Sequence, residues 1–187
     1  MSLLALRAVA CVRGGRLLFE GLDLDLPPGR AAVVTGPNGS GKSSLLRLAA
    51  GLLPAAAGQV ERNALAALAD ERLALDERLN LRRALGFWAG LDGAMAEAGL
   101  RAMGLERIAD VPVRMLSTGQ RKRAALARVV ASRAPLWLLD EPANGLDSDG
   151  RDRLEAAMAA HRSNGGAILA ATHQPLGLAD AETVNLR

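Results

Sequence analysis

The chain has 187 residues, a net charge of +3 and a hydrophobic content of 50%, which excludes a disordered polypeptide and suffices for one domain with a buried core. The basic residues are spread along the chain and form no single patch, so we expect no nucleic-acid partner. The single cysteine, Cys11, excludes an internal disulfide, and no run of about 18 uncharged apolar residues is present that could span a membrane. The lone cysteine fits a reducing compartment, and the start of the chain lacks the features of a signal peptide.

The first part of the chain predicts several strands and one helix. Residues 3–9 and 22–26 favour strands, and in the second of these apolar and acidic residues alternate, which predicts one buried face. Residues 31–35 form a short apolar run that is typical of a strand buried on both faces. A glycine-rich loop and a helix over about 43–50 follow, and residues 64–69 are a further candidate strand.

The second part of the chain is predicted to begin with helices and to return to strands. Helices are expected over about 78–89, 121–133 and 148–163, with short helical pieces up to about residue 105. Apolar strands are expected at 136–139 and 167–172.

Strands that alternate with helices imply a parallel sheet with crossover helices, so the fold class is α/β. We expect residues 1–187 to form one domain. Its core is predicted to comprise about 1–70 and 134–187, and a helical subdomain is predicted over about 76–133 as an insertion.

One segment fits the phosphate-loop pattern G-x-x-x-x-G-K-[ST] at every required position: Gly36-Pro37-Asn38-Gly39-Ser40-Gly41-Lys42-Ser43. Glycines let the backbone turn sharply and bring N–H groups against phosphate oxygens, and the start of the following helix attracts anions. Lys42 is expected to reach the β- and γ-phosphates, and the Ser43 hydroxyl is expected to bind Mg²⁺. A chance match to a glycine-rich turn is the weaker reading, because a buried strand precedes the loop and a helix follows it. The loop by itself predicts a nucleoside triphosphatase without saying which kind.

Two adjacent carboxylates, Asp140 and Glu141, directly follow the apolar run 136–139. The carboxyl ends of parallel strands surround the ligand in such sheets, so Asp140 is expected to hold Mg²⁺ through water. Glu141 is then the candidate for polarising the water that attacks the phosphate. The alternative is a charged strand end that faces solvent, and the phosphate loop upstream makes that alternative weaker.

A helix is predicted to start at Ser117-Thr118-Gly119-Gln120, where the Ser117 side chain and the Gly119 N–H are potential donors to phosphate. The phosphate loop already supplies such donors. A second phosphate-binding helix start therefore predicts a nucleotide held between two copies of the chain. The alternative is an ordinary serine N-cap.

Three further features give the chain a family resemblance. Leu116-Ser117-Thr118-Gly119-Gln120 resembles the signature motif of the ABC transporter ATPases, and Asn144-Gly145-Leu146-Asp147 resembles the loop that follows their catalytic glutamate. His173, after an apolar strand, resembles their switch histidine. The motifs appear in the family order, and the resemblance covers essentially the whole chain. It implies a P-loop NTPase fold with a RecA-like parallel sheet core, an antiparallel β-subdomain and a helical subdomain.

The resemblance also implies how the site is assembled. In this family two ATP-binding domains hold two ATP molecules head to tail, each between the phosphate loop of one copy and the signature helix of the other. Lys42, Glu141 and His173 would be the catalytic residues, with Glu141 as the general base and His173 at the γ-phosphate. Ser43 and Asp140 would serve Mg²⁺. The remaining contacts to ATP would come from Gly36 to Ser44, Ser117, Gly119 and Gln120.

A finer resemblance concerns residues 172–176 (Thr-His-Gln-Pro-Leu) and 14–22, which are similar to the ATP-binding subunits of the heme exporters of cytochrome c biogenesis. This implies transmembrane permease subunits as partners and a peripheral location at the cytoplasmic face of the bacterial inner membrane. Heme or another cargo would be handled by the partner subunits, because the chain carries no Cys-x-x-Cys-His motif. The alternative is an ABC-type ATPase with a regulatory or non-transport role and weak intrinsic hydrolysis.

Two features of the family pattern are missing. The glutamine that contacts Mg²⁺ and couples to the membrane subunits has no counterpart, and its position lies near Glu71 or Arg72, so Glu71 is a candidate Mg²⁺ ligand. The segment 58–78 is short, which predicts a reduced β-subdomain. The aromatic residue that stacks on adenine is also missing; Arg13 is the candidate replacement and Phe19 a weaker one. The alternative for Arg13 is a solvated turn residue.

Overall fold

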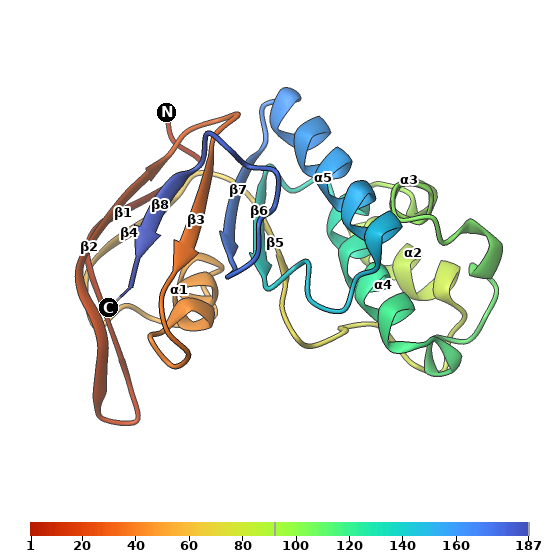
Figure 1. Cartoon of the computed structure of the whole chain (residues 1–187), viewed down its shortest axis with the longest axis horizontal. Coiled ribbons are helices and arrows are strands. Elements are labelled where there is room, and N and C mark those ends of the chain that lie inside the picture. The colour runs from red at the N-terminus through yellow and green to blue at the C-terminus, as the bar shows by residue number, and fades with distance from the viewer. Residues whose placement is uncertain (92, 187) are drawn as a thin grey trace.

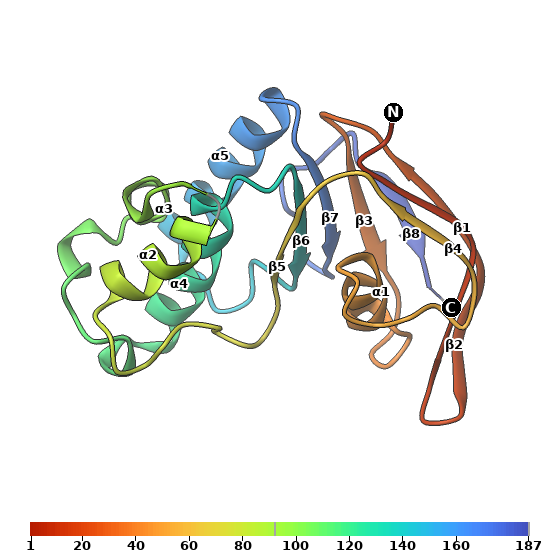
Figure 2. The ribbon, with the colours of Figure 1, turned by 180° about the vertical axis from the view of Figure 1, so that it is seen from behind.

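The computed structural model describes residues 1–91 and 93–186. The molecule is elongated, with an antiparallel sheet at one end, a parallel sheet in the middle and a group of helices at the other end (Figure 1; Figure 2). This arrangement confirms the predicted parallel core with an antiparallel β-subdomain and a helical insertion. No described helix is both long enough and apolar enough to cross a membrane.

The central sheet has five parallel strands in the order β5-β6-β7-β3-β8. The strands are β3 (Ala31–Thr35), β5 (Ala66–Ala69), β6 (Leu136–Asp140), β7 (Ala167–Ala171) and β8 (Glu182–Asn185). Every residue of β6 and β7 is buried, as expected for central strands covered on both faces. The edge strand β8 was not predicted, because Val184 is its only buried residue and its sequence carries almost no apolar signal.

The second sheet has three antiparallel strands in the order β2-β1-β4. They are β1 (Leu4–Arg13), β2 (Arg16–Leu26) and β4 (Ala57–Arg62). The predicted strand bounds were too short, because β1 and β2 continue into a long hairpin that turns at Gly14 and Gly15. The strand β4 was not predicted, since Val60 is its only large apolar residue and none of its residues is buried.

Five α-helices complete the described fold: α1 (Lys42–Ala49), α2 (Leu81–Leu91), α3 (Ala96–Ala102), α4 (Thr118–Ala131) and α5 (Ser148–Ser163). Two short 3₁₀ turns, Glu106–Ile108 and Val113–Met115, join α3 to α4. The helix α4 begins at Thr118, within the segment 117–120 where a helix start was predicted, although the helical run itself was expected only from about residue 121. Ser117 and Gln120 form a capping box there, in which each side chain bonds the backbone of the other residue.

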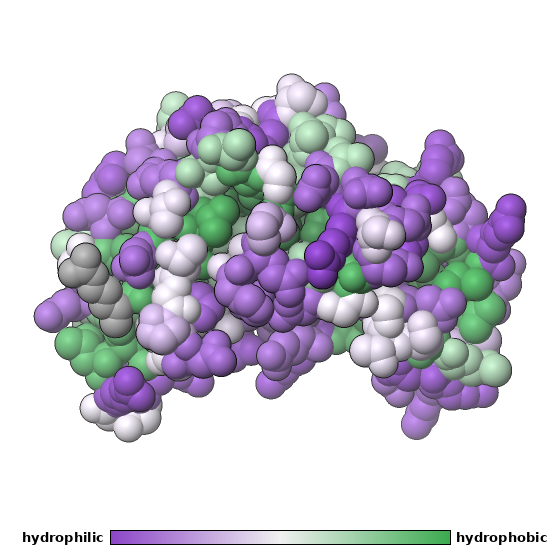
Figure 3. All heavy atoms as spheres, viewed as in Figure 1, coloured by the Kyte–Doolittle hydropathy of each residue, from purple (hydrophilic) through white to green (hydrophobic). Residues whose placement is uncertain are grey.

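Two hydrophobic clusters lie on the two faces of the parallel sheet. Alternate side chains of β6 point to opposite faces: Leu136 and Leu138 pack with α1 and the antiparallel sheet, whereas Trp137 and Leu139 pack with α2 to α5. The parallel sheet therefore has one cluster beside the antiparallel sheet and another at the helical end. Polar residues cover much of the face in Figure 3, and apolar surface remains near the β1–β2 hairpin, where Val12 pairs with Leu17, and at the helical end.

Candidate functional site

The carboxyl ends of three neighbouring strands, β3, β6 and β7, bring the predicted residues to one edge of the sheet. The backbone continues the strand pairing beyond β6, since the N–H of Glu141 donates to the Ala171 carbonyl oxygen at 2.8 Å. The N–H of Thr172 likewise donates to the Val34 carbonyl oxygen at 3.3 Å. The start of the phosphate loop, the carboxylate pair and the segment containing His173 therefore lie side by side. This convergence comes from the parallel topology.

The phosphate loop joins β3 to α1 and has the backbone that its glycines allow. Gly36, Gly39 and Gly41 have φ angles of 144°, 82° and 104°. A Cβ atom at Gly36 would overlap the carbonyl oxygen of Leu186, so only glycine fits there. The Lys42 Nζ atom donates to the carbonyl oxygens of Gly36, at 2.8 Å, and of Pro37, at 3.1 Å. The ammonium group thus lies over its own loop, where it can neutralise a bound anion.

Asp140 is the buried acid of the site, with a residue exposure of 7%. Burial raises the pKa of its carboxyl group, the neighbouring carboxylates of Glu141, Glu71 and Asp70 add to this, and a hydrogen bond with the Ser43 side chain opposes it. Carboxylate and hydroxyl oxygens are hard donors of the kind that Mg²⁺ prefers. No group of three or more His, Cys, Asp or Glu residues in the described chain has the geometry of a metal site. This donor set fits Mg²⁺, which binds through one or two protein groups together with phosphate and water, and it fits a metal held entirely by protein less well.

Glu141 has an unusual backbone conformation, and only one of its two carboxylate oxygens has a hydrogen-bond partner among the described residues. Its φ angle is 44°, in the left-handed region that side-chain-bearing residues rarely adopt and that is often found at functional sites. The Oε1 atom lies 2.9 Å from His173 Nδ1. The Oε2 atom is buried and has no hydrogen-bond partner among the described residues. A buried carboxylate oxygen without a donor is costly, so this atom is available to a water molecule or a ligand proton.

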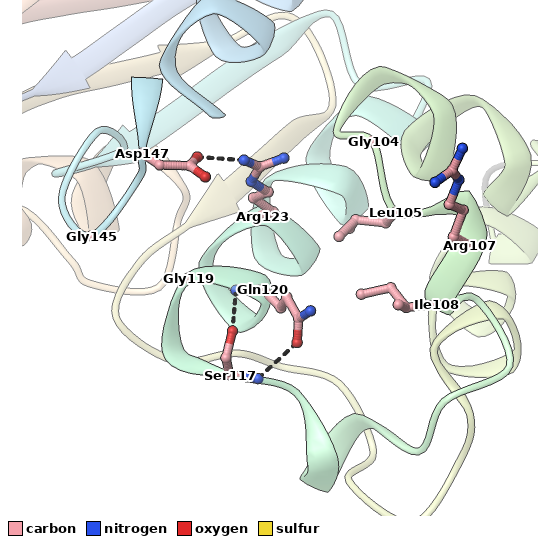
Figure 4. A pocket seen from close by; sticks show the side chains of 10 residues that line it. All are labelled: Gly104, Leu105, Arg107, Ile108, Ser117, Gly119, Gln120, Arg123, Gly145 and Asp147. Atoms are coloured by element: carbon pink, nitrogen blue, oxygen red, sulfur yellow. Dashed lines mark hydrogen bonds and ion pairs between the residues drawn. The ribbon is translucent and has the colours of Figure 1, made fainter. Parts of the chain in front are cut away.

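Ser117 and Gln120 lie away from the phosphate loop. The Ser117 Oγ atom accepts from the Gln120 N–H at 3.3 Å, and the Gln120 Oε1 atom accepts from the Ser117 N–H at 2.9 Å. These residues and Gly119 line a pocket of about 400 Å³ (Figure 4). Its other lining residues are Gly104, Leu105, Arg107, Ile108, Arg123, Gly145 and Asp147. None of the described residues that line this pocket belongs to the phosphate loop. Figure 1 also shows the start of α4 and the loop before α1 on different sides of the molecule.

An ion-pair network that sequence reasoning missed connects α4 to the segment after Glu141. Arg123 donates to the carboxylate of Asp147 and, at 2.8 Å, to Asp149 Oδ2. Asp147 also caps α5 by accepting from the Gly150 N–H at 2.9 Å. The start of α4 and residues 144–147 are therefore held as one unit. The sequence offered no signal for this, because Arg123 is more than 20 positions from both aspartates along the chain.

The other candidates have separate places in the structure. Arg13 is exposed at the end of β1, opposite Arg16 across the hairpin. Phe19 is buried in the core, and a Cβ at Gly41 would lie 3.1 Å from its ring, so Phe19 supports the phosphate loop and has too little free face to stack on a base. Glu71 is exposed in the loop after β5, beside the sheet edge.

Comparisons with known proteins agree with this architecture. The family model described as "ABC transporter" matches residues 19–144. The chain is 58% identical over 183 residues to the Cytochrome c biogenesis ATP-binding export protein CcmA of Sphingopyxis alaskensis, covering 96% of this chain and 94% of that protein. It is 54% identical over 179 residues to the protein of the same name from Novosphingobium aromaticivorans, with coverages of 96% and 93%.

Solved structures show the same fold. An ATP-binding subunit of an ABC transporter superposes with a TM-score of 0.89 at 23% identity, over 100% of this chain and 86% of that one. An ATP-binding cassette solved as a dimer with ADP and Pi superposes with a TM-score of 0.86 at 22% identity, over 98% and 94%. The match to the family model and the sequence identity with relatives of nearly the same length both show the family of this chain. This chain belongs to the ABC transporter family and, within it, to the cytochrome c biogenesis ATP-binding export proteins.

Proposed function

We propose that this chain binds and hydrolyses ATP to drive export by a membrane complex of cytochrome c biogenesis. The observation that carries this proposal is the arrangement of Glu141, whose Oε1 lies 2.9 Å from His173 Nδ1 while Oε2 is buried without a partner. The reaction is the attack of water on the γ-phosphorus, which breaks its bond to the bridging oxygen and gives ADP and phosphate. Catalysis of this step depends on positioning and on neutralising charge.

The phosphate loop would hold the triphosphate through its backbone N–H groups and Lys42. Bound phosphate would replace the loop carbonyl oxygens as the partners of the Lys42 ammonium group. Ser43 and Asp140 would hold Mg²⁺, which neutralises charge on the phosphates. Glu141 would accept the proton of the attacking water, and its neighbour His173 would keep the carboxylate in place and contact the γ-phosphate.

The signature segment would act on the nucleotide of a second copy. Ser117, Gly119 and Gln120 line a pocket separate from the phosphate loop, which supports a site completed by two chains. In that arrangement the phosphate loop of one chain faces Ser117 to Gln120 of the other, head to tail. The ion pair from Arg123 to Asp147 would then couple two nucleotide sites. It would connect the signature segment, which contacts the nucleotide of the second copy, to residues 144–147 of its own chain, which follow its own Glu141.

The partners would be transmembrane permease subunits, which place the chain at the cytoplasmic face of the bacterial inner membrane. Exposed apolar side chains support a protein contact, since Leu52, Leu65 and Leu91 surround a pocket of about 440 Å³ together with Trp88. The cargo would be heme, held by the partners, because cytochromes c carry covalently attached heme and the relatives are named for their biogenesis.

Replacing the wild-type chain by Glu141→Gln in a bacterium that makes cytochromes c tests the proposal. We expect the variant to reach the membrane fraction and the heme-stained cytochromes c to disappear from gels. Glu61→Gln, at an exposed position of β4, removes the same charge far from the site and should leave them unchanged. Normal cytochromes c in the Glu141→Gln strain, or a wild-type chain that purifies without permease subunits, would refute the export role and favour a regulatory one.

A further inference from the structure

A second lysine lies at the carboxyl edge of the parallel sheet. The chain has 23 basic residues, and only Lys42 and Lys122 are lysines. An ammonium group is a compact point charge, whereas the guanidinium group is a broad planar fork, so the two are not interchangeable beside a small ion. Lys42 belongs to the phosphate loop. Lys122 lies on α4, just after the signature segment, and the proposed reaction gives it no role.

The surroundings of Lys122 are acidic. Its Nζ atom makes a long hydrogen bond of 3.4 Å to the carbonyl oxygen of Asp140. The carboxylates of Asp140 and Glu141 at the end of β6, and of Glu71 and Asp70 after β5, all lie close enough to attract its charge. Lys122 is half-buried, so water screens these interactions less than on an open surface.

The same carboxylates crowd the proposed Mg²⁺ site. Glu141, Glu71 and Asp70 each act on the Asp140 carboxyl group as like charges, which shows an excess of negative charge around it. Arg47 pairs with Asp70 at 3.4 Å and offsets one of these charges. Lys122 brings a further positive charge from the helical part of the molecule to the point where the backbone of Asp140 ends the strand.

We propose that the ammonium group of Lys122 lowers the affinity of the Ser43–Asp140 site for its divalent cation, so that the cation is held firmly only together with nucleotide phosphates. A fixed positive charge repels a divalent ion twice as strongly as it repels a monovalent one. The ammonium group also attracts the neighbouring carboxylates, which would otherwise bind the metal ion when no nucleotide is present. The bound triphosphate supplies new negative charge and outweighs this repulsion.

The test measures the binding of Mn²⁺, as a stand-in for Mg²⁺, by electron paramagnetic resonance on the full chain without nucleotide and with a non-hydrolysable ATP analogue. In Lys122→Met, we expect Mn²⁺ binding without nucleotide to tighten by about tenfold, with a smaller change in the presence of the analogue. Lys122→Arg keeps the positive charge but not the compact ammonium group, so it should tighten Mn²⁺ binding by less than Lys122→Met does, which a purely steric role would not require. Arg151→Met removes one charge from an exposed position of α5 and should change nothing.

Mn²⁺ affinity in Lys122→Met that is equal to or weaker than that of the wild type would overturn the proposal. If this variant does not fold, Lys122→Gln decides, because it removes the same charge but keeps a polar side chain, and it should also tighten Mn²⁺ binding without nucleotide. Unchanged affinity in that variant also overturns the proposal. The inference rests on the proposed nucleotide site, and the two fail differently. A wild-type chain that binds no Mn²⁺ even with the analogue contradicts the proposed function, whereas normal wild-type binding with no effect of Lys122 contradicts only this inference.

Discussion

The imidazole of His173 lies 2.9 Å from one carboxylate oxygen of Glu141, although 32 positions separate the two residues in the chain. They meet because β6 and β7 are adjacent parallel strands and each residue follows the end of its strand. The contact uses one oxygen of Glu141 and leaves the other without a described partner. The bond to His173 thus fixes the orientation of the Glu141 carboxylate, and its second oxygen remains free. This is expected of a group that must both stay in place and accept a proton.

Glu141→Gln in the purified protein should separate ATP binding from hydrolysis. The amide keeps the shape of the side chain but is a poor proton acceptor, so we expect the hydrolysis rate to fall by about 100-fold or more. ATP should then accumulate in a dimer, seen by light scattering coupled to size-exclusion chromatography. The control is Glu61→Gln, and wild-type turnover by Glu141→Gln would exclude Glu141 as the base.

Gly36→Ala should disable the phosphate loop. The new Cβ would overlap the Leu186 carbonyl oxygen and lie 2.8 Å from Ser40 Oγ, so the loop must move. We expect ATP affinity to be lost and the free energy of unfolding to fall by about 2 kcal/mol, measured by calorimetry and urea denaturation. Gly39→Ala shares a positive φ angle but meets open space, and it should keep most of the binding. Equal losses in the two variants would mean that backbone strain, and not the overlap, is responsible.

Arg123→Ala should loosen the connection between α4 and the segment 144–147. Without the bonds from Arg123 to Asp147 and Asp149, faster amide hydrogen exchange is expected in residues 144–150. ATP-dependent dimerisation of Glu141→Gln should weaken by about fivefold when Arg123→Ala is added. Arg153→Ala removes a contact to the same Asp149 from within α5, and because it leaves α4 untouched it should have little effect.

His161 should make stability depend on pH. Burial lowers the pKa of its imidazole below the usual value, so the unfolded chain binds a proton first as the pH falls. The contribution of the neutral side chain is complete above the unfolded pKa of about 6.5 and is lost progressively below it. His161→Phe keeps a ring stacked on Trp137, at 3.9 Å between centroids, but loses the bond to the Pro135 carbonyl oxygen.

Urea denaturation of this variant should show about 1 kcal/mol less stability near pH 8. The decline in the free energy of unfolding between about pH 7 and pH 5 should be smaller than in the wild type. An identical decline in both proteins would assign the acid sensitivity to other groups.

Arg13→Ala tests the proposed stacking on adenine. If the guanidinium covers one face of the base, ATP affinity should fall by about threefold, measured with a fluorescent ATP analogue. Arg16 faces Arg13 across the hairpin, so Arg16→Ala is the matched loss of charge. Unchanged affinity in Arg13→Ala, or equal losses in both variants, would leave Arg13 as a solvated turn residue.

Buried strands and local motifs were predictable from the sequence, whereas polar edges were not. The strand β7 is apolar throughout, and β3 and β6 are apolar up to their last residues, Thr35 and Asp140. A continuous apolar run is among the strongest signals of secondary structure in a sequence. The strands β4 and β8 are stabilised by their partners in the sheets and not by their own residues, so a local pattern could not reveal them.

The same division holds for the site. The phosphate loop, the pair Asp140–Glu141 and His173 each stand at a recognisable local position, the end of an apolar strand. The partners of Lys122 and Arg123 could not be predicted, because Gln120-Arg121-Lys122-Arg123 is a run of polar residues that spreads around the helix and marks no single face. Only the tertiary structure shows that Lys122 faces β6 while Arg123 faces the start of α5.

The order of strands in the parallel sheet also dictates when the phosphate loop can form during synthesis. The phosphate loop follows the strand β3, which pairs with β7 on one side and β8 on the other. Both partner strands leave the ribosome long after β3. The Leu186 carbonyl oxygen that packs against Gly36 emerges later still. A nascent chain that stops before residue 167 therefore holds the apolar strand β3 without either of its partners in the sheet, and its phosphate loop lacks the backbone against which Gly36 packs.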